Sequence, residues 1–232
     1  MSDLRQKVVD VCRILYVEGH ADMSLGHASG REPGAQTIFL KPRLLGFEEV
    51  VVDDVVEMDL EGKQISGRAG PPGEWPLHTE IYKVRPDVNG IVHSHPLWTT
   101  LFGITGLPFQ PVNQDSVMFY KGLKIFTGTP ELLTTKEMGA ELAAQFLEGN
   151  AIIMPNHGAV IVGSTIEEAL LLSLNLEKAL QAQLMVHAFG GARNVIDPAM
   201  ATKMGEKLFA QTKRTLDLYG YSARKANRVL GA

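Results

Sequence analysis

Glycine and proline divide this sequence into short segments that alternate irregularly between strand-like and helix-like patterns. Strands are expected at 37–40, 90–93, 123–126, 151–154 and 159–162, with a hairpin within 50–65. Helices are expected at 8–16, 75–84, 134–146, 164–186 and 203–218. Residues 25–30, which include Gly26 and Gly30, are expected to form a turn. This irregular order favours an α+β or mixed α/β fold over a regular βαβ array.

Composition limits the class of protein further. The 232 residues are 45% hydrophobic, enough for one core, and no linker-like stretch divides them, so a single domain over 1–232 is expected. Cys12 is the only cysteine, which excludes a disulfide framework. The net charge of -4 offers no basic surface for nucleic acid. Without a signal-like or membrane-spanning apolar run, a cytoplasmic protein with no membrane partner is expected.

Three of the seven histidines have the spacing of metal ligands. His93 and His95 are two apart at the end of an expected strand, so both rings can face one point. His157 lies in another turn between strands, next to Gly158. Three neutral imidazoles leave open positions on a divalent ion, as in catalytic sites, where the ion polarises a carbonyl or enolate oxygen. The alternative is that these histidines are ordinary core residues. His20 and His187 receive no role.

A glutamate forms the third element of the candidate site. Glu74 follows Gly70-Pro71-Pro72-Gly73, where the chain bends into a helix, so its carboxylate can project into a cleft. The alternative is a charge placed at a helix N-terminus because the helix dipole favours it. His78 comes one helical turn later and can share the face of Glu74, or it can be structural.

Taken together, these motifs resemble the class II aldolase/adducin family. The resemblance covers about residues 4–221. Its motifs are Gly73-Glu74-Trp75-Pro76-Leu77-His78, Arg85-Pro86-Asp87-Val88, Val92-His93-Ser94-His95 and Asn156-His157-Gly158. The resemblance implies a three-layer α/β/α sandwich with a mainly antiparallel central sheet. It also implies a homotetramer with active sites at subunit interfaces.

The resemblance also assigns roles within the site. It implies one divalent metal ion (Zn, Mn, Co or Fe) held by His93, His95 and His157, with Glu74 as the acid/base. The family often supplies a C-terminal tyrosine from a neighbouring chain as a proton donor, which here points to Tyr219 or Tyr221. The alternative for these tyrosines is packing of an aromatic clasp on the core.

The sequence departs from the sugar-phosphate members of the family where they bind phosphate. Those members carry Gly-Asn in the first glycine turn and Ser-Ser before the glutamate. Gly26-His27 and Pro72-Gly73 stand in their place, so two hydrogen-bond donors are missing. His27, Lys41 and Arg43 are present instead, and such groups suit a planar carboxylate. The alternative for Lys41 and Arg43 is solvated loop charges.

This pattern is similar to the family subgroup that decarboxylates hydroxy-aromatic or enol carboxylates. Decarboxylation and aldol cleavage both break a carbon–carbon bond and leave an enolate that a Lewis acid must stabilise. We therefore expect a divalent-metal-dependent carbon–carbon lyase, most readily a decarboxylase, for a small non-phosphorylated hydroxy or keto carboxylate bound by His27, Lys41, Arg43 and His78. The alternatives are an aldolase for a sugar phosphate or 2-keto acid, an adducin-like interaction module without catalysis, and an Fe(II) oxygenase.

Overall fold

The structure is a computed structural model that describes residues 4–231. One sheet of eight strands forms its centre, in the order β4-β3-β2-β1-β5-β8-β7-β6. Only the β6–β7 pair is parallel. The strands are β1 His27–Gly30, β2 Thr37–Leu40, β3 Val56–Asp59, β4 Gln64–Ser66, β5 Gly90–Ser94, β6 Lys124–Ile125, β7 Ala151–Met154 and β8 Gly158–Gly163.

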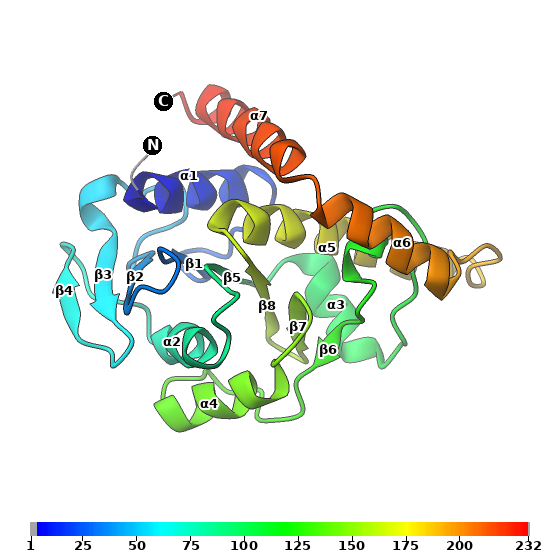
Figure 1. Ribbon diagram of the computed structural model, residues 1–232, viewed down its shortest axis with the longest axis horizontal. Coiled ribbons are helices and arrows are strands. Elements are labelled where there is room, and N and C mark those ends of the chain that lie inside the picture. Colours follow the sequence, from blue (N-terminus) through cyan, green and yellow to red (C-terminus); the bar gives the residue numbers. More distant parts are fainter. Residues whose placement is uncertain (1–3, 232) are drawn as a thin grey trace.

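Helices cover both faces of this sheet (Figure 1). The α-helices are α1 Leu4–Val17, α2 Trp75–Val84, α3 Leu97–Thr105, α4 Lys136–Gln145, α5 Ile166–Ala188, α6 Pro198–Phe209 and α7 Thr212–Leu230. Two 3₁₀ turns, η1 Val52–Asp54 and η2 Ser116–Phe119, lie in the connections. The expected three-layer α/β/α sandwich with a mainly antiparallel sheet is confirmed. Within the described residues, no helix is long and apolar enough to cross a membrane.

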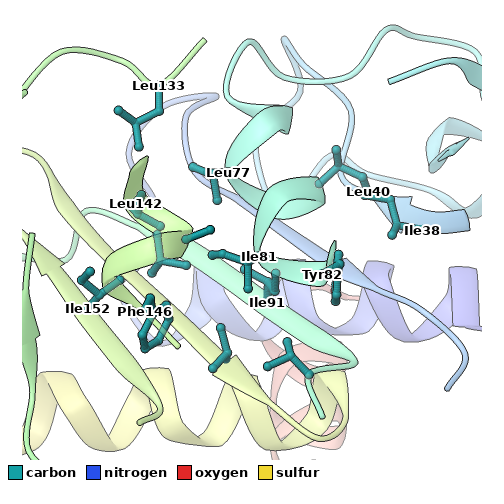
Figure 2. Close-up of a cluster of buried hydrophobic side chains, with 14 of the residues drawn as sticks. Ile38, Leu40, Leu77, Ile81, Tyr82, Ile91, Leu133, Leu142, Phe146 and Ile152 are labelled. Atoms are coloured by element: carbon teal, nitrogen blue, oxygen red, sulfur yellow. The ribbon is translucent and has the colours of Figure 1, made fainter. Parts of the chain in front are cut away.

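Apolar side chains point alternately to the two faces of the sheet along each strand, so a separate core forms on each face. On β5, Ile91 faces α2 and α4, whereas Val92 faces α1 and α5. Figure 2 shows the first core, where Ile81 and Tyr82 of α2 and Phe146, which follows α4, all lie over the sheet. Because successive strand residues point to opposite faces, His93 must lie on the α2 face, like Ile91. The sheet therefore directs His93 toward the start of α2.

Most expected elements are present, and three differ. Residues 27–30 are strand β1 and not a turn. These residues have weak strand propensity, but pairing with β2 on one side and β5 on the other holds them in the extended conformation. Helix α3 begins directly after Pro96, where the sequence indicated only the end of a strand. The expected last helix over 203–218 is two helices, α6 and α7, which separate at Ala210 and Gln211 without any glycine or proline.

Candidate metal centre

Three histidines converge at the ends of two adjacent strands. His93 is in β5, His95 follows it, and His157 is in the tight turn between β7 and β8. Asn156 allows this turn by adopting the left-handed conformation, with φ of 61°. Antiparallel pairing of Ser94 with Ala159 then brings the two strand ends together. The ligand nitrogens of the three rings all lie within 4.8 Å of one another.

Gly158 makes this convergence possible. A Cβ atom at this position would lie 2.5 Å from the carbonyl oxygen of Ser94 and 2.6 Å from Cδ2 of His95. Such distances are too short for any side chain, so the backbone of β8 can approach the His95 ring only with glycine here.

Hydrogen bonds fix which nitrogen of two of these rings faces the centre. His93 donates from Nδ1 to the carbonyl oxygen of Ala159 at 3.0 Å. His95 donates from Nδ1 to the Asp22 carboxylate at 2.9 Å. In each neutral ring Nε2 is therefore the acceptor, which is the state that binds a metal ion. These two Nε2 atoms lie only 3.0 Å apart, and with both ring hydrogens on Nδ1 each of them presents a lone pair, an arrangement that a shared cation would stabilise.

His157 completes the trio. Both of its ring nitrogens are buried, and neither has a hydrogen-bond partner within the described part of the chain. Its ring centre lies 5.1 Å from that of His93 and 5.2 Å from that of His95. An unpaired buried acceptor is costly, and binding a metal ion through Nε2 would satisfy it. The donor set therefore fits a divalent first-row metal ion such as Zn²⁺, Mn²⁺, Co²⁺ or Fe²⁺.

Glu74 lies beside the trio, at the N-terminus of α2. Its side chain makes no capping hydrogen bond to the helix, so the carboxylate is available to the centre. Oε1 accepts a 2.9 Å hydrogen bond from the backbone N–H of Leu133. Oε2 lies 3.5 Å from Nε2 of His93, 3.6 Å from Nε2 of His157 and 3.9 Å from Nε2 of His27. One oxygen is therefore held by the backbone, while the other faces the imidazoles.

Burial and neighbouring groups set the charges of the site. Burial by itself raises the pKa of Glu74, but the neighbouring imidazoles of His157, His27 and His93 outweigh this effect and bring the pKa well below its ordinary value. Burial lowers the pKa of His27 to about 3 and that of His95 to about 4. At neutral pH the site thus combines an ionised Glu74 carboxylate with the neutral imidazoles of His27 and His95, which suits a cation.

His27 and His78 lie on the α2 side of the trio. His27 is paired with His93 across β1 and β5, so both rings are on the same face of the sheet. Nδ1 of His27 is 2.7 Å from Nε2 of His78, and Nε2 of His27 faces Glu74. His78 is completely buried. The structure therefore brings His27 to the centre and places His78 behind it.

Two expected substrate-binding cations have different environments. Lys41 is buried, and its ammonium donates to the carbonyl oxygens of Ser24 and Pro42 above the Phe47 ring. Its contacts fix the loop before β1. Arg43 is exposed, and its guanidinium lies against Gly70, at the start of the segment that leads to Glu74. Of these two, only Arg43 is free to meet a solute.

Tyr219 lies outside this cluster within the chain. It is on α7, packs against the core formed with α1, and donates a 3.0 Å hydrogen bond to Asp10. Burial and the Asp10 carboxylate raise the pKa of its phenol. Tyr221 is on the same helix and is about half exposed.

A cleft of about 650 Å³ opens beside the trio. His95 and His157 line its floor, and Leu25, Leu97 and Leu132 line its rim. These leucines are 49%, 62% and 58% exposed, so they add apolar surface to a lining that also includes polar side chains such as Asp22 and Asn156. Sequence analysis missed Asp22 and the Leu133 backbone N–H, because neither has a local signal and both reach the site only through the fold.

Comparison with known proteins agrees with this fold. The profile of the "Class II Aldolase and Adducin N-terminal domain" matches residues 6–184. The chain therefore belongs to the class II aldolase and adducin family.

Individual relatives include enzymes with different reactions. The chain is 26% identical over 212 residues to 3,4-dihydroxyphthalate decarboxylase of Arthrobacter keyseri, covering 85% of this chain and 84% of that protein. It is 30% identical over 167 residues to L-fuculose phosphate aldolase of Methanocaldococcus jannaschii, covering 71% and 87%. The solved structure of L-fuculose 1-phosphate aldolase from Glaciozyma antarctica PI12 superposes with a TM-score of 0.85 and 27% identity, covering 98% of this chain and 90% of that one.

Proposed function

We propose that this protein is a divalent-metal-dependent carbon–carbon lyase that decarboxylates a small hydroxy-aromatic or enol carboxylate. The observation that carries the proposal is the convergence of three imidazole acceptors on one point beside the buried carboxylate of Glu74. His93, His95 and His157 would hold the ion. When bound, the ion supplies Lewis acidity that stabilises negative charge on a substrate oxygen.

Glu74 has the position and charge of a proton carrier. Its ionised Oε2 takes the proton from the substrate hydroxyl when the substrate binds. Glu74 then returns this proton to the ring carbon that bears the substrate carboxylate, which gives the keto tautomer and leaves Glu74 ionised again. The bond between that carbon and the substrate carboxylate breaks, CO₂ leaves, and the bonding electrons restore the ring and place the negative charge on the adjacent oxygen. The Leu133 N–H holds Oε1 and thereby keeps Oε2 directed at the reacting atoms.

Substrate selection follows from the rim of the cleft and its nearby charges. The exposed leucines 25, 97 and 132 suit the face of an aromatic ring. His27 can donate a hydrogen bond to a substrate oxygen, and Arg43 can bind a carboxylate in bidentate fashion. We assign Lys41 and His78 to supporting roles, because both are buried, Lys41 on backbone carbonyl oxygens and His78 on His27. Similarity to 3,4-dihydroxyphthalate decarboxylase supports this choice of substrate class.

Aldol cleavage of a sugar phosphate is the second candidate. The similarity to two L-fuculose phosphate aldolases, one in sequence and one in structure, favours it. The chain offers fewer phosphate donors, however, because neither Pro72 nor Gly73 carries a hydroxyl and proline has no backbone N–H. We therefore rank it below decarboxylation.

The decisive experiment measures both reactions with the same preparation. Purified protein with Mn²⁺, Zn²⁺, Co²⁺ or Fe²⁺ is tested for CO₂ release from ortho-hydroxy aromatic carboxylates. In parallel it is tested for condensation of dihydroxyacetone phosphate with an aldehyde. We expect CO₂ release that His157→Ala abolishes and His187→Ala, on the exposed end of α5, leaves intact. Condensation without CO₂ release would make the protein an aldolase, and neither activity with any ion would contradict both.

We further propose that the protein acts as a homotetramer in the cytoplasm, with active sites at the subunit interfaces. In that assembly Tyr219 or Tyr221 of a neighbouring chain would be the additional proton donor. Light scattering combined with size-exclusion chromatography tests the assembly, and a Tyr221→Phe variant with unchanged rate would remove Tyr221 from the reaction.

A further inference from the structure

A continuous chain of buried hydrogen bonds runs from the candidate metal centre into the α2 core. Nδ1 of His27 is 2.7 Å from Nε2 of His78, and Nδ1 of His78 is 2.7 Å from Oγ of Ser29. Oγ of Ser29 is 2.9 Å from the hydroxyl of Tyr82. Each of these four residues is at most 4% exposed. At the other end, Nε2 of His27 faces Oε2 of Glu74.

If every hydroxyl and ring hydrogen of the chain bonds to a neighbouring member, the chain can run in only two directions, because each neutral imidazole carries one ring hydrogen and one lone pair. In the first direction Tyr82 donates to Ser29, Ser29 to His78, and His78 to Nδ1 of His27. Nε2 of His27 then carries the hydrogen. In the second direction every bond is reversed, and Nε2 of His27 presents a lone pair.

The Tyr82 end favours the first direction. In the second direction Ser29 donates to the Tyr82 oxygen, and the phenol hydrogen needs another acceptor. The neighbour over the Tyr82 ring is Arg31, whose guanidinium centre lies 4.6 Å from the ring centre and has no acceptor atom. Ser29 is the only hydrogen-bond partner of this hydroxyl among the described residues. A buried hydroxyl without an acceptor is costly.

The Glu74 end favours the same direction. Nε2 of His27 is 3.9 Å from Oε2 of Glu74, and a carboxylate oxygen can accept a hydrogen but cannot donate one when it is ionised. The penalty of the second direction falls at the Tyr82 end of the chain. The first direction gives each hydrogen within the chain an acceptor and directs the Nε2 hydrogen of His27 toward Glu74.

We propose that Tyr82, Ser29 and His78 lock His27 in the tautomer with hydrogen on Nε2, which makes His27 a fixed hydrogen-bond donor to oxygen at the metal centre. His27, Glu74 and His93 also form a cluster with the spacing of metal ligands. The lock excludes His27 as a ligand and leaves the ion to His93, His95 and His157. Ser29, His78 and Tyr82 are then positioning residues. The inference rests on the metal centre of the proposed function but not on the reaction.

Nitrogen NMR tests the tautomer directly. The full chain, labelled with ¹⁵N-histidine and loaded with diamagnetic Zn²⁺, gives long-range correlations between ring protons and ring nitrogens that identify each tautomer. Loss of one ring's signals in His27→Gln, and of another's in His78→Gln, assigns the two rings. We expect hydrogen on Nε2 in both. Hydrogen on Nδ1 of His27, or on both of its nitrogens, would overturn the proposal.

Two variants test the lock, and a third serves as a control. Ser29→Ala cuts the chain, and Tyr82→Phe removes its terminal donor while keeping the ring that packs in the core. We expect the His27 nitrogen shifts to move toward the average of both tautomers in at least one of these variants. Tyr16→Phe, on the partly exposed side of α1, should leave them unchanged. Unchanged His27 shifts in both chain variants would overturn the lock.

The NMR result for the His27 tautomer does not depend on whether the protein releases CO₂. If the tautomer is as expected but CO₂ is not released, the lock stands and the proposed reaction is wrong. If CO₂ is released but His27 carries its hydrogen on Nδ1, the reaction stands and the lock is wrong. The wild-type spectrum decides the proposal even if a variant fails to fold.

Discussion

Nε2 of His93 and Nε2 of His95 lie 3.0 Å apart, and a hydrogen bond on the other nitrogen of each ring turns these atoms toward one another. The two supports differ in kind. His93 is held by the backbone carbonyl of Ala159, which no substitution of a side chain removes. His95 is held by the carboxylate of Asp22, which can be replaced.

Asp22→Asn should therefore weaken metal binding. An amide can still accept from Nδ1 of His95, but it can also donate, and it lacks the charge that raises the basicity of the ring. We expect a loss of about 10- to 100-fold in Zn²⁺ affinity, measured by competition with a chelator. Asp53→Asn, in the exposed turn η1, is the matched control. Equal affinities for Asp22→Asn and the wild type would show that Asp22 does not support the ligand.

Glu74→Gln should keep the metal and lose turnover. The amide retains an oxygen that can accept from Leu133, so the local structure should persist. It cannot take or return a proton, so we expect kcat for CO₂ release to fall by about 10²- to 10⁴-fold. Metal content by elemental analysis and kcat are measured on the same samples, with Glu80→Gln on α2 as the control. A variant with normal kcat would remove Glu74 from the mechanism.

Arg43→Ala should raise KM more than it lowers kcat. The guanidinium is exposed beside the segment that leads to Glu74, and a charge-assisted bond to a carboxylate is worth about 1.5–3 kcal/mol. We therefore expect KM for the carboxylate substrate to rise about tenfold or more. Arg68→Ala, on the exposed ion pair with Asp53, should not change KM. A KM unaffected by Arg43→Ala would make Arg43 a solvated loop charge.

The stability of the fold should depend on pH through His20. Burial lowers the pKa of this imidazole to about 4, from an ordinary value of 6.5, and its Nδ1 contacts the hydroxyl of Ser94. Between these values the unfolded chain binds a proton that the folded chain does not, so stability rises with pH. The contribution is complete above pH 6.5 and is lost as pH falls toward 4. It amounts to about 3 kcal/mol at most.

Urea unfolding of the metal-free protein at several pH values between 4 and 7 measures this effect. His20→Gln should flatten the pH dependence, although His27 and His95 contribute in the same direction because burial lowers their pKa as well. His187→Gln, on the exposed end of α5, should leave the pH profile unchanged. A His20→Gln profile as steep as that of the wild type would contradict the prediction.

Elements with clear local sequence signals were predicted correctly. Helix Trp75–Val84 lies between a glycine-proline break and Pro86, and strands Thr37–Leu40 and Ala151–Met154 are apolar runs with clear ends. Strand β1 was missed because its residues have little strand propensity and it forms through pairing on both sides. The boundary between α6 and α7 was missed because no breaker marks Ala210.

The same distinction applies to the candidate site. His93, His95, His157 and Glu74 could be found because their motifs are contiguous in sequence. The contact of Asp22 with His95 joins residues 73 positions apart, and that of Tyr82 with Ser29 joins residues 53 apart. The burial of Lys41 likewise depends on Phe47 and on the path of the loop before β1. Such relationships come from packing, which short motifs do not encode.

The lack of space for a side chain at Gly158 limits which positions of this protein can be redesigned. Randomised libraries can vary the leucines at positions 25, 97 and 132, which face solvent at the mouth of the cleft. Position 158 accepts no such variation, because even the Cβ atom of alanine would clash with the Ser94 carbonyl oxygen and the His95 ring. New substrate preferences must therefore be engineered at the mouth, while the strand junction beneath it is kept as it is.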